Sequence, residues 1–329
     1  MTAKFVVSHV PTPADGGPTT GNQSWVAAAQ MLIERADKTD GVAPLSEQFL
    51  LHLAENEAWV ATAESQAREP HKSAALIGFV TYNGETAELV VDPDSRRQGV
   101  ATALLDAADA HTGTADNNGL GIPVWAHGNL PAAQQLAQKR RMSATRQLLV
   151  LGRPLVASGA LDSSTGNSGV ETAVFPLGFE LLDLTASRLV HPDTDAQWLT
   201  VNNQAFSWHP EQGGWTADRL AAAQTPDWFD PHGVLLLWHG EELAGFHWLK
   251  IPDQPVPAGQ REGEVYVIGI ADNYRGQHLS RPLMTAGLEH LREHGCDRVI
   301  LYVEADNEAA VSLYRSLGFT VQEQHYLYS

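Results

Sequence analysis

The sequence predicts an α/β (α+β) protein in which one unit of strands and helices occurs twice in tandem. Two observations support this prediction. The stretch 263–319 reads as strand, glycine-containing turn, helix, strand, turn and helix. The same order of elements occurs earlier, over 89–136, so the chain is interpreted as an internal duplication of one unit.

Length and charge limit the possible organisation and partners. The 329 residues suffice for two domains, and 43% hydrophobic residues suffice for two cores. The 39 acidic and 21 basic residues give a net charge of −18, which disfavours nucleic acid and anionic membranes as partners. The charge suits a small cationic substrate, although most of these carboxylates are simply expected to form a solvated surface.

Cysteine usage and hydropathy predict a cytoplasmic protein. Cys296 is the single cysteine, so an intramolecular disulfide is excluded and a reducing compartment fits. No base adjoins Cys296 in the sequence, so it is interpreted as a packing residue. The N-terminus has no long apolar core, so no signal peptide is expected, and no stretch is apolar for long enough to cross a bilayer.

The first copy begins with strands and helices that alternate in hydrophobicity. Strands are predicted at 4–10, 58–64, 75–82, 86–91 and 123–126, and helices at about 22–37 and 47–56. Asn83-Gly84 predicts a tight hairpin turn. After the strand at 86–91 come Arg96, two residues, and then Gly99, Val100 and Ala101. A turn of this kind before a helix leaves backbone N–H groups unpaired, which makes an anion site.

The second copy follows a Ser/Gly/Thr-rich segment that predicts a flexible linker. The chain is therefore divided into an N-terminal domain at 1–156, a linker at 157–177 and a C-terminal domain at 178–329. A helix is predicted near 193–203, a hairpin at 234–239 and 242–250, and a strand at 263–270.

The two copies have diverged in opposite senses. In the second turn, Arg275 is followed by His278 and Ser280 at the two positions that Gly99 and Ala101 occupy in the first. The second copy in turn has Tyr314 where the first has Leu136. The first copy thus keeps the phosphate loop, whereas the second keeps a tyrosine that can transfer a proton.

These segments resemble the GNAT family of N-acetyltransferases. Its hallmark is a strand followed by Q/R-x-x-G-x-G/A, whose backbone amides hold the pyrophosphate of acetyl-CoA. The stretch 307–319, N-E-A-A-V-S-L-Y-R-S-L-G-F, is similar to the family's other familiar segment. The resemblance implies two GNAT-fold domains, each a mixed, mostly antiparallel twisted sheet flanked by helices. It also implies acetyl-CoA as co-substrate and no metal.

Further segments narrow the resemblance to one tandem branch of the family. H-P-E-Q-G-G-W at 209–215, F-H-W-L-K at 246–250 and D-G-V-A-P-L-S-E-Q at 40–48 are similar to the mycothiol synthases. This implies acetyl transfer to the cysteinyl amine of cysteinyl-glucosaminyl-inositol by a cytoplasmic, monomeric enzyme. Its C-terminal domain would do the chemistry, and its N-terminal domain would bind acetyl-CoA without a reaction of its own.

The resemblance also implies site residues, with Glu264 as general base and Tyr314 as general acid. The substrate contacts would be Glu47, Glu211, Lys250, Glu264 and Tyr302. Acetyl-CoA would lie along Leu89, Val90, Val91, Arg97, Gln98, Gly99, Val100, Ala101 and Thr102 in the first copy, and along Ile268, Gly269, Ile270, Arg275, Gly276, Gln277, His278, Leu279, Ser280, Arg281, Asn307, Glu308, Ala309, Ala310, Val311 and Ser312 in the second.

The chemistry of these residue types fits acyl transfer to an amine. The ammonium must lose a proton, which a carboxylate on a cleft-facing strand such as Glu264 can accept. A backbone N–H near Ile270 can stabilise the oxyanion, and a tyrosine hydroxyl can protonate the departing thiolate. Each residue also has a structural interpretation: Tyr314 and Tyr302 as core, and the charged side chains as solvated, paired or helix-capping groups.

Two other functions remain open at the level of sequence. A tandem acetyltransferase for another small amine, such as an aminoglycoside or a peptide N-terminus, would also use acidic residues. A non-catalytic acetyl-CoA sensor would use the intact first turn, with His278 marking a lost second site. His290 to His294 matches the H-x-x-E-H zinc pattern, but it is interpreted as coincidence because this helix follows the phosphate turn.

Overall fold

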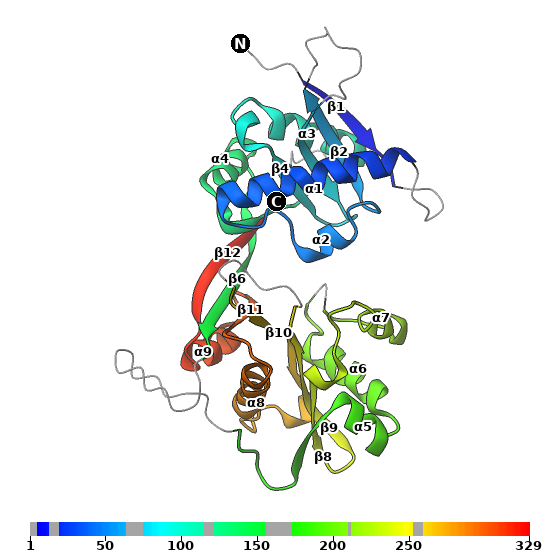
Figure 1. Cartoon of the computed structure of the whole chain (residues 1–329), viewed down its shortest axis with the longest axis vertical. Coiled ribbons are helices and arrows are strands. Elements are labelled where there is room, and N and C mark those ends of the chain that lie inside the picture. Colours follow the sequence, from blue (N-terminus) through cyan, green and yellow to red (C-terminus); the bar gives the residue numbers. More distant parts are fainter. Residues whose placement is uncertain are drawn as a thin grey trace. The chain divides into compact units, whose positions relative to one another are not determined.

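The computed structural model describes residues 5–12, 20–63, 75–114, 121–155, 173–209, 212–252 and 259–329. Contacts divide the chain into two compact units (Figure 1). The N-terminal unit comprises 1–149 with 304–306 and 323–329, and the C-terminal unit comprises 150–303 with 307–322. Residues 157–172, most of the predicted linker, lie outside the described residues.

The N-terminal unit is a mixed sheet between helices. Its elements are β1 (Phe5–Val10), α1 (Thr20–Asp40), α2 (Glu47–Leu51), β2 (Glu57–Ala63), β3 (Leu76–Tyr82), β4 (Ala87–Val91), η1 (Pro93–Ser95), α3 (Val100–Thr112), β5 (Val124–Ala126), η2 (His127–Asn129), α4 (Pro131–Arg140) and part of β6 (Ala144–Pro154). The strands lie in the order β1-β2-β3-β4-β5 and are antiparallel except for the parallel pair β4 and β5.

Strand alternation gives this sheet two apolar faces. Val60, Phe79 and Val90 belong to one cluster of buried residues, which the apolar stripe of α1 completes. Their neighbours Trp59 and Val80 belong to a second cluster on the opposite face, which α3 completes. The sheet is thus covered on both sides, and Figure 1 shows α1 lying across one of its faces.

The C-terminal unit repeats the same plan. Its elements are β7 (Phe179–Asp183), α5 (Leu184–Val190), α6 (Thr194–Ala205), α7 (Ala217–Ala222), η3 (Pro231–Gly233), β8 (Val234–His239), β9 (Glu242–Lys250), β10 (Glu262–Ile270), η4 (Asp272–Tyr274), α8 (Ser280–Glu293), β11 (Arg298–Glu304), α9 (Glu308–Ser316) and part of β12 (Thr320–Tyr328). The order is β7-β8-β9-β10-β11, antiparallel except for the parallel pair β10 and β11. The predicted tandem α/β fold is therefore confirmed.

The final strand of the chain belongs largely to the N-terminal unit. Residues 323–328 of β12 are part of that unit together with Ser329, and Tyr326 pairs there with Ala126 of β5 in antiparallel register. In the same way, 150–154 of β6 belong to the C-terminal unit. Each unit is thus completed by a strand segment that comes from the other half of the sequence.

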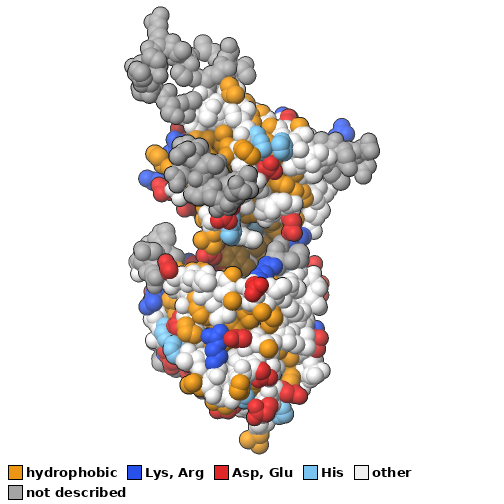
Figure 2. Space-filling view, turned by 90° about the vertical axis from the view of Figure 1, so that its right-hand side faces the viewer, with side chains coloured by type: hydrophobic (Ala, Val, Ile, Leu, Met, Phe, Trp, Pro, Cys, Tyr) orange, Lys and Arg blue, Asp and Glu red, His pale blue; other side chains and the backbone are white. Residues whose placement is uncertain are grey.

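One face of the molecule shows how its acidic residues are distributed. On the face shown in Figure 2, Asp and Glu side chains are scattered among neutral and basic ones and form no single patch. This distribution agrees with the expected solvated surface. No helix among the described residues has the length and apolar character needed to cross a membrane.

A buried histidine occupies the centre of the C-terminal unit. His247 on β9 is fully buried, and its Nδ1 lies 3.0 Å from the Leu283 carbonyl oxygen of α8. Gly287 of α8 leaves room for the ring, since a Cβ there would lie 2.0 Å from His247 Cε1. Burial lowers the pKa of His247 to about 4, because the charged form loses its hydration.

This histidine predicts acid sensitivity. An unfolded histidine gains its proton near pH 6.5, whereas folded His247 stays neutral to about pH 4, so stability falls as the pH drops through this window. The free energy of unfolding should lose about 3 kcal/mol over the window. Urea unfolding at a series of pH values should show a smaller loss for His247→Gln than for wild type.

The exposed histidine of α2's C-cap provides the control for this experiment. His52→Gln should leave the pH dependence of unfolding unchanged, because its ring is about half exposed. An equal pH dependence in wild type and His247→Gln would show that other groups dominate, His325 being the first candidate because burial also lowers its pKa to about 4.

Candidate active site

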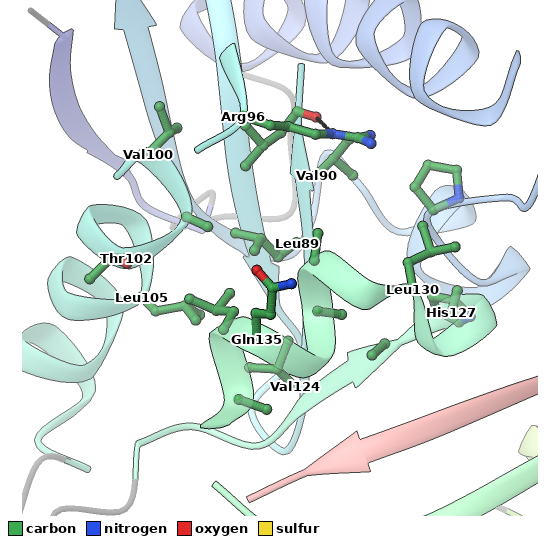
Figure 3. Close-up of a pocket in the computed structure, with 18 of the residues that line it drawn as sticks. Leu89, Val90, Arg96, Val100, Thr102, Leu105, Val124, His127, Leu130 and Gln135 are labelled. Atoms are coloured by element: carbon green, nitrogen blue, oxygen red, sulfur yellow. Dashed lines mark hydrogen bonds between the residues drawn. The ribbon is translucent and has the colours of Figure 1, made fainter. Parts of the chain in front are cut away.

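The N-terminal unit contains a cavity beside the predicted phosphate turn. Its volume is about 510 Å³, and it is lined by β4, the turn, the start of α3, β5 and α4. Figure 3 shows Leu89 and Val90 of β4, Val100 and Thr102 of α3, and Gln135 of α4 around it. The lining includes every residue of 89–102 that the resemblance assigned to acetyl-CoA except Gln98.

Strand pairing explains why the cavity opens here. β4 pairs with β3 as far as Val91, but it pairs with β5 only from Ala87 to Glu88. The backbone of 89–91 therefore faces no strand on the β5 side. A pantetheine chain can occupy such a gap and take the hydrogen bonds that a neighbouring strand would make.

The C-terminal unit shows the same gap. β10 pairs with β11 only from Glu262 to Val265, whereas its pairing with β9 continues to Ile270. The backbone of 266–270 is thus left without a β11 partner. This is the stretch of strand where the resemblance implied acetyl-CoA contacts at Ile268, Gly269 and Ile270.

The two phosphate turns have the same backbone conformation despite their different sequences. Arg97 and Gly99 have φ angles of 63° and 88°, and the matching Gly276 and His278 have 78° and 58°. Each turn thus has two residues in the left-handed conformation, and one of the two is a glycine. The glycine is the second of them in the first copy and the first of them in the second copy. His278 takes a conformation that histidine adopts more readily than most residues, and its side chain is exposed.

Neither turn uses its backbone amides within the described part of the chain. The N–H groups of 98–101 and of 277–280 stand at or just before a helix start, where no intrahelical acceptor exists. They fit a pyrophosphate, which such a turn binds through its N–H groups and the helix dipole. The backbone of the second turn therefore keeps the conformation of the first despite His278.

Arg96 links the first phosphate turn to helix α1 and strand β4. Both of its terminal nitrogens donate to Asp40 of α1 at 2.7 Å, and its Nε donates to the Val91 carbonyl oxygen at 3.2 Å. The Asp40 carboxylate raises the pKa of Arg96 above its ordinary value. Arg96 thus holds the turn against α1, while the neighbouring Arg97 lines the cavity.

Two of the predicted substrate residues meet directly in the C-terminal unit. Glu264 and Lys250 lie opposite each other on β10 and β9, and Lys250 Nζ is 3.7 Å from Glu264 Oε2. Their side chains are only 14% and 8% exposed, so this ion pair is weakly screened by solvent. A carboxylate and an ammonium held in this way can bind a zwitterionic or polar amine substrate.

Aromatic rings surround this ion pair. Lys250 Nζ lies 4.8 Å from the centre of the Trp228 ring and 5.9 Å from that of Tyr266, within the range of cation–π attraction. Trp228 also packs edge-on against Tyr266, with ring centroids 5.0 Å apart. The sequence analysis did not assign Trp228 and Tyr266 to the site. Aromatic residues near a lysine at a strand end are a signal for cation–π contacts of this kind.

The other predicted residues are placed as follows. Tyr302 on β11 is half exposed and lies two residues beyond Ile300, the β11 partner of Glu264, so it faces the same side of the sheet. Glu47 opens α2 after its Ser46 cap and belongs to the N-terminal unit. Glu211 lies outside the described residues.

Tyr314 lies on the inner face of α9. The helix starts at the Asn307 cap, whose side chain accepts from Ala310 N–H at 3.2 Å. Tyr314 is buried, and its ring packs against Phe319 with centroids 5.9 Å apart. Burial raises its pKa to about 12, because the phenolate would lose hydration. Its hydroxyl makes no hydrogen bond to another described side chain.

Models of known protein families match both units of the chain. The acetyltransferase (GNAT) family model matches residues 199–319, and the acetyltransferase (GNAT) domain model matches residues 54–140. The two matches lie in the two copies that the sequence pattern had separated.

Curated relatives match over nearly the whole chain. A mycothiol acetyltransferase of Corynebacterium aurimucosum is 43% identical over 304 residues, which cover 89% of this chain and 91% of that protein. One from Corynebacterium glutamicum is 42% identical, covering 91% and 92%. One from Catenulispora acidiphila is 40% identical over 322 residues, covering 93% and 96%.

Solved structures match in fold. A GCN5-related N-acetyltransferase from Sphaerobacter thermophilus has a TM-score of 0.64 at 18% identity, with 98% of this chain and 94% of that one covered. A tandem GNAT protein from the clavulanic acid biosynthesis pathway has a TM-score of 0.63 at 17% identity, with 98% of both chains covered. These likenesses agree with the tandem arrangement described above.

Proposed function

The chain belongs to the mycothiol acetyltransferase family of tandem GNAT enzymes, and from this membership we propose that it acetylates the cysteinyl amine of cysteinyl-glucosaminyl-inositol. It is an acetyl-CoA-dependent N-acetyltransferase. The products of the proposed reaction are mycothiol and CoA. The observation that carries the proposal is about 40% identity to mycothiol acetyltransferases along nine tenths of the chain.

In the proposed mechanism, Glu264 accepts a proton from the substrate ammonium, directly or through water. The freed amine nitrogen attacks the thioester carbonyl carbon, and a new C–N bond forms. A backbone N–H near Ile270 stabilises the oxyanion that develops on the carbonyl oxygen. When the C–S bond breaks, Tyr314 donates its proton to the departing thiolate, and the nitrogen returns its second proton to the Tyr314 oxygen, directly or through water, as the amide forms. No covalent enzyme intermediate is needed.

The ion pair in the C-terminal unit supports this assignment of roles. Lys250 Nζ lies 3.7 Å from Glu264 Oε2, so the proposed base lies beside a basic side chain that can contact the substrate at the same place. Lys250, Tyr302, Glu47 and Glu211 are proposed to bind the polar groups of the substrate. The two reactants held in one site would react with an effective concentration far above that in solution.

Acetyl-CoA is proposed to bind in both copies of the fold. In the C-terminal domain, 178–329, it would lie along 268–270, 275–281 and 307–312 and take part in the reaction. In the N-terminal domain, 1–156, it would lie along 89–91 and 97–102 without being consumed. The similar turns of the two copies support two binding sites. A monomeric state and a cytoplasmic location are parts of the same proposal.

The decisive experiment compares amine acceptors with the wild-type protein. CoA and acetylated product should both form with cysteinyl-glucosaminyl-inositol, counted by chromatography and mass because the acceptor itself carries a thiol. Glucosaminyl-inositol, which lacks the cysteine, is the matched acceptor and should give no product. Transfer to an aminoglycoside or a peptide N-terminus in place of the expected acceptor would leave the fold assignment intact but overturn the substrate. Binding of acetyl-CoA without transfer to any amine would favour the sensor.

A further inference from the structure

Three chemically reactive side chains meet at a place that the acetyltransferase reaction does not use. His9 comes from β1, Glu57 from β2 and His111 from the last turn of α3. The Glu57 Oε1 atom lies 2.8 Å from His9 Nε2 and 3.1 Å from His111 Nε2. The potential ligand atoms of all three side chains lie within 4.8 Å of one another.

The register of the sheet explains this meeting. His9 pairs with Trp59 across β1 and β2, so Glu57, two residues before Trp59, lies diagonally opposite His9 on the same face. That face is the one covered by α3, whose C-terminal turn brings His111 over it. Both imidazoles pack against the buried Trp59 ring, with centroids 5.1 Å and 5.7 Å away.

We propose that His9, Glu57 and His111 bind a divalent metal ion of the zinc class, with water as the fourth ligand. Two imidazole nitrogens and one carboxylate oxygen form a ligand set that zinc accepts, and an open fourth position is common for three protein ligands. Bonds of about 2.1 Å in a tetrahedron require ligand atoms about 3.4 Å apart. The observed separations of 2.8 Å and 3.1 Å need only small side-chain movements to reach this geometry.

The burial of the three side chains fits a site that an ion can enter from solvent. The His9 and Glu57 side chains are largely covered, whereas His111 is about half exposed. The three side chains come from three separate elements, whereas His52 and Glu55 of the same unit form a pair at 2.8 Å within one short segment.

The location of the site indicates a structural role. α3 starts at the phosphate turn with Val100, and His111 lies eleven residues later, about 16 Å along the helix axis. The ion would therefore lie away from the acetyl-CoA cavity. It would join the edge strand β1 to β2 and α3, and it would take no part in acetyl transfer.

Cobalt(II) is the spectroscopic probe for this proposal, because it replaces zinc and absorbs visible light when its site is tetrahedral. Untagged full-length protein, freed of metal by a chelator, should take up one equivalent of Co²⁺ with visible absorption and release it to Zn²⁺. His9→Ala, Glu57→Gln and His111→Ala should each weaken binding by more than about tenfold, the loss known even for partners outside the ligand shell. His52→Ala should bind as wild type does.

Thermal unfolding provides the second measurement. Zn²⁺ should raise the unfolding temperature of wild type and of His52→Ala but not of the three ligand variants, because an ion that binds only the folded state stabilises it. Acetyl-CoA binding by the ligand variants shows whether they are folded. Wild-type protein that takes up no tetrahedral Co²⁺, or ligand variants that bind it as tightly as wild type, would overturn the proposal.

Discussion

Glu264→Gln is expected to lower kcat/KM for acetyl transfer by about 10²- to 10⁴-fold, the range that a lost general base produces. Glutamine has the same size and keeps a hydrogen-bond acceptor, but it cannot take the ammonium proton. The loss should appear mainly as a lower kcat and much less as a higher KM for acetyl-CoA. Steady-state kinetics with counted CoA and product measure both.

The pH dependence separates a base from a binding residue. Without Glu264, the reaction depends on amine molecules that have already lost their proton, and α-amines do so near pH 8. The variant should therefore recover part of its deficit as the pH rises to about 8, because free amine becomes abundant. A deficit that is equal at every pH would assign Glu264 to binding alone.

Glu262→Gln is the matched control for this experiment. Glu262 lies on the same strand, is also partly covered, and pairs with Arg298 at 2.9 Å. Like Glu264, it is an ion-paired glutamate of β10, but it has no assigned role in the reaction. Its glutamine variant should retain activity. If both variants lose activity equally, the loss reflects the structure of β10 and not proton transfer.

Tyr314→Phe is expected to lower kcat by about 10²-fold, the lower end of the effect of general acids. The substitution removes one hydroxyl and keeps the ring that packs on Phe319. Because burial raises the pKa of Tyr314 to about 12, the hydroxyl holds its proton throughout the working range, and the proton is present when the thiolate departs. Single-turnover rates of CoA release measure this step.

Varying the thiol of the acetyl thioester tests whether Tyr314 is a general acid or only a packing residue. An acetyl thioester with a more acidic thiol needs less protonation as it departs, so it should lose less rate in Tyr314→Phe than acetyl-CoA does. Tyr82→Phe, which removes a hydroxyl from β3 of the N-terminal unit, should leave both rates unchanged. An unchanged kcat together with a lower unfolding temperature would make Tyr314 a packing residue.

Local hydrophobic patterns predicted much of the fold because they depend on neighbouring residues. The hairpin of β8 and β9 occurs at its predicted bounds, since alternation and Gly240 fix both strands and their turn. The predicted helix at 47–56 is only α2, because His52 already ends it as C-cap. β6 and β12 were not predicted, since neither of them forms a local hairpin.

The candidate site was predictable in part for similar reasons. The sequence pattern showed His278 at the position of a glycine but could not show its effect, because the backbone has two left-handed residues and accepts the glycine at either of them. Spacing along a strand also placed Glu264 and Lys250 on strands but could not show that they face each other, because register depends on the bulge between Val265 and Val267. Trp228 reaches Lys250 from a loop, which no periodic pattern describes.

The exchange of end segments between the two halves sets the order of events during synthesis on the ribosome. Strand β5 pairs with Tyr326 and its neighbours, which are translated only after the second copy. The N-terminal unit therefore cannot complete its sheet until the second copy has been made, unlike most leading domains, which fold first. A gene cut between the two copies would yield a first half with an open sheet edge, the kind of surface that recruits other strands. Neither copy can therefore complete its unit without a segment from the other half of the sequence.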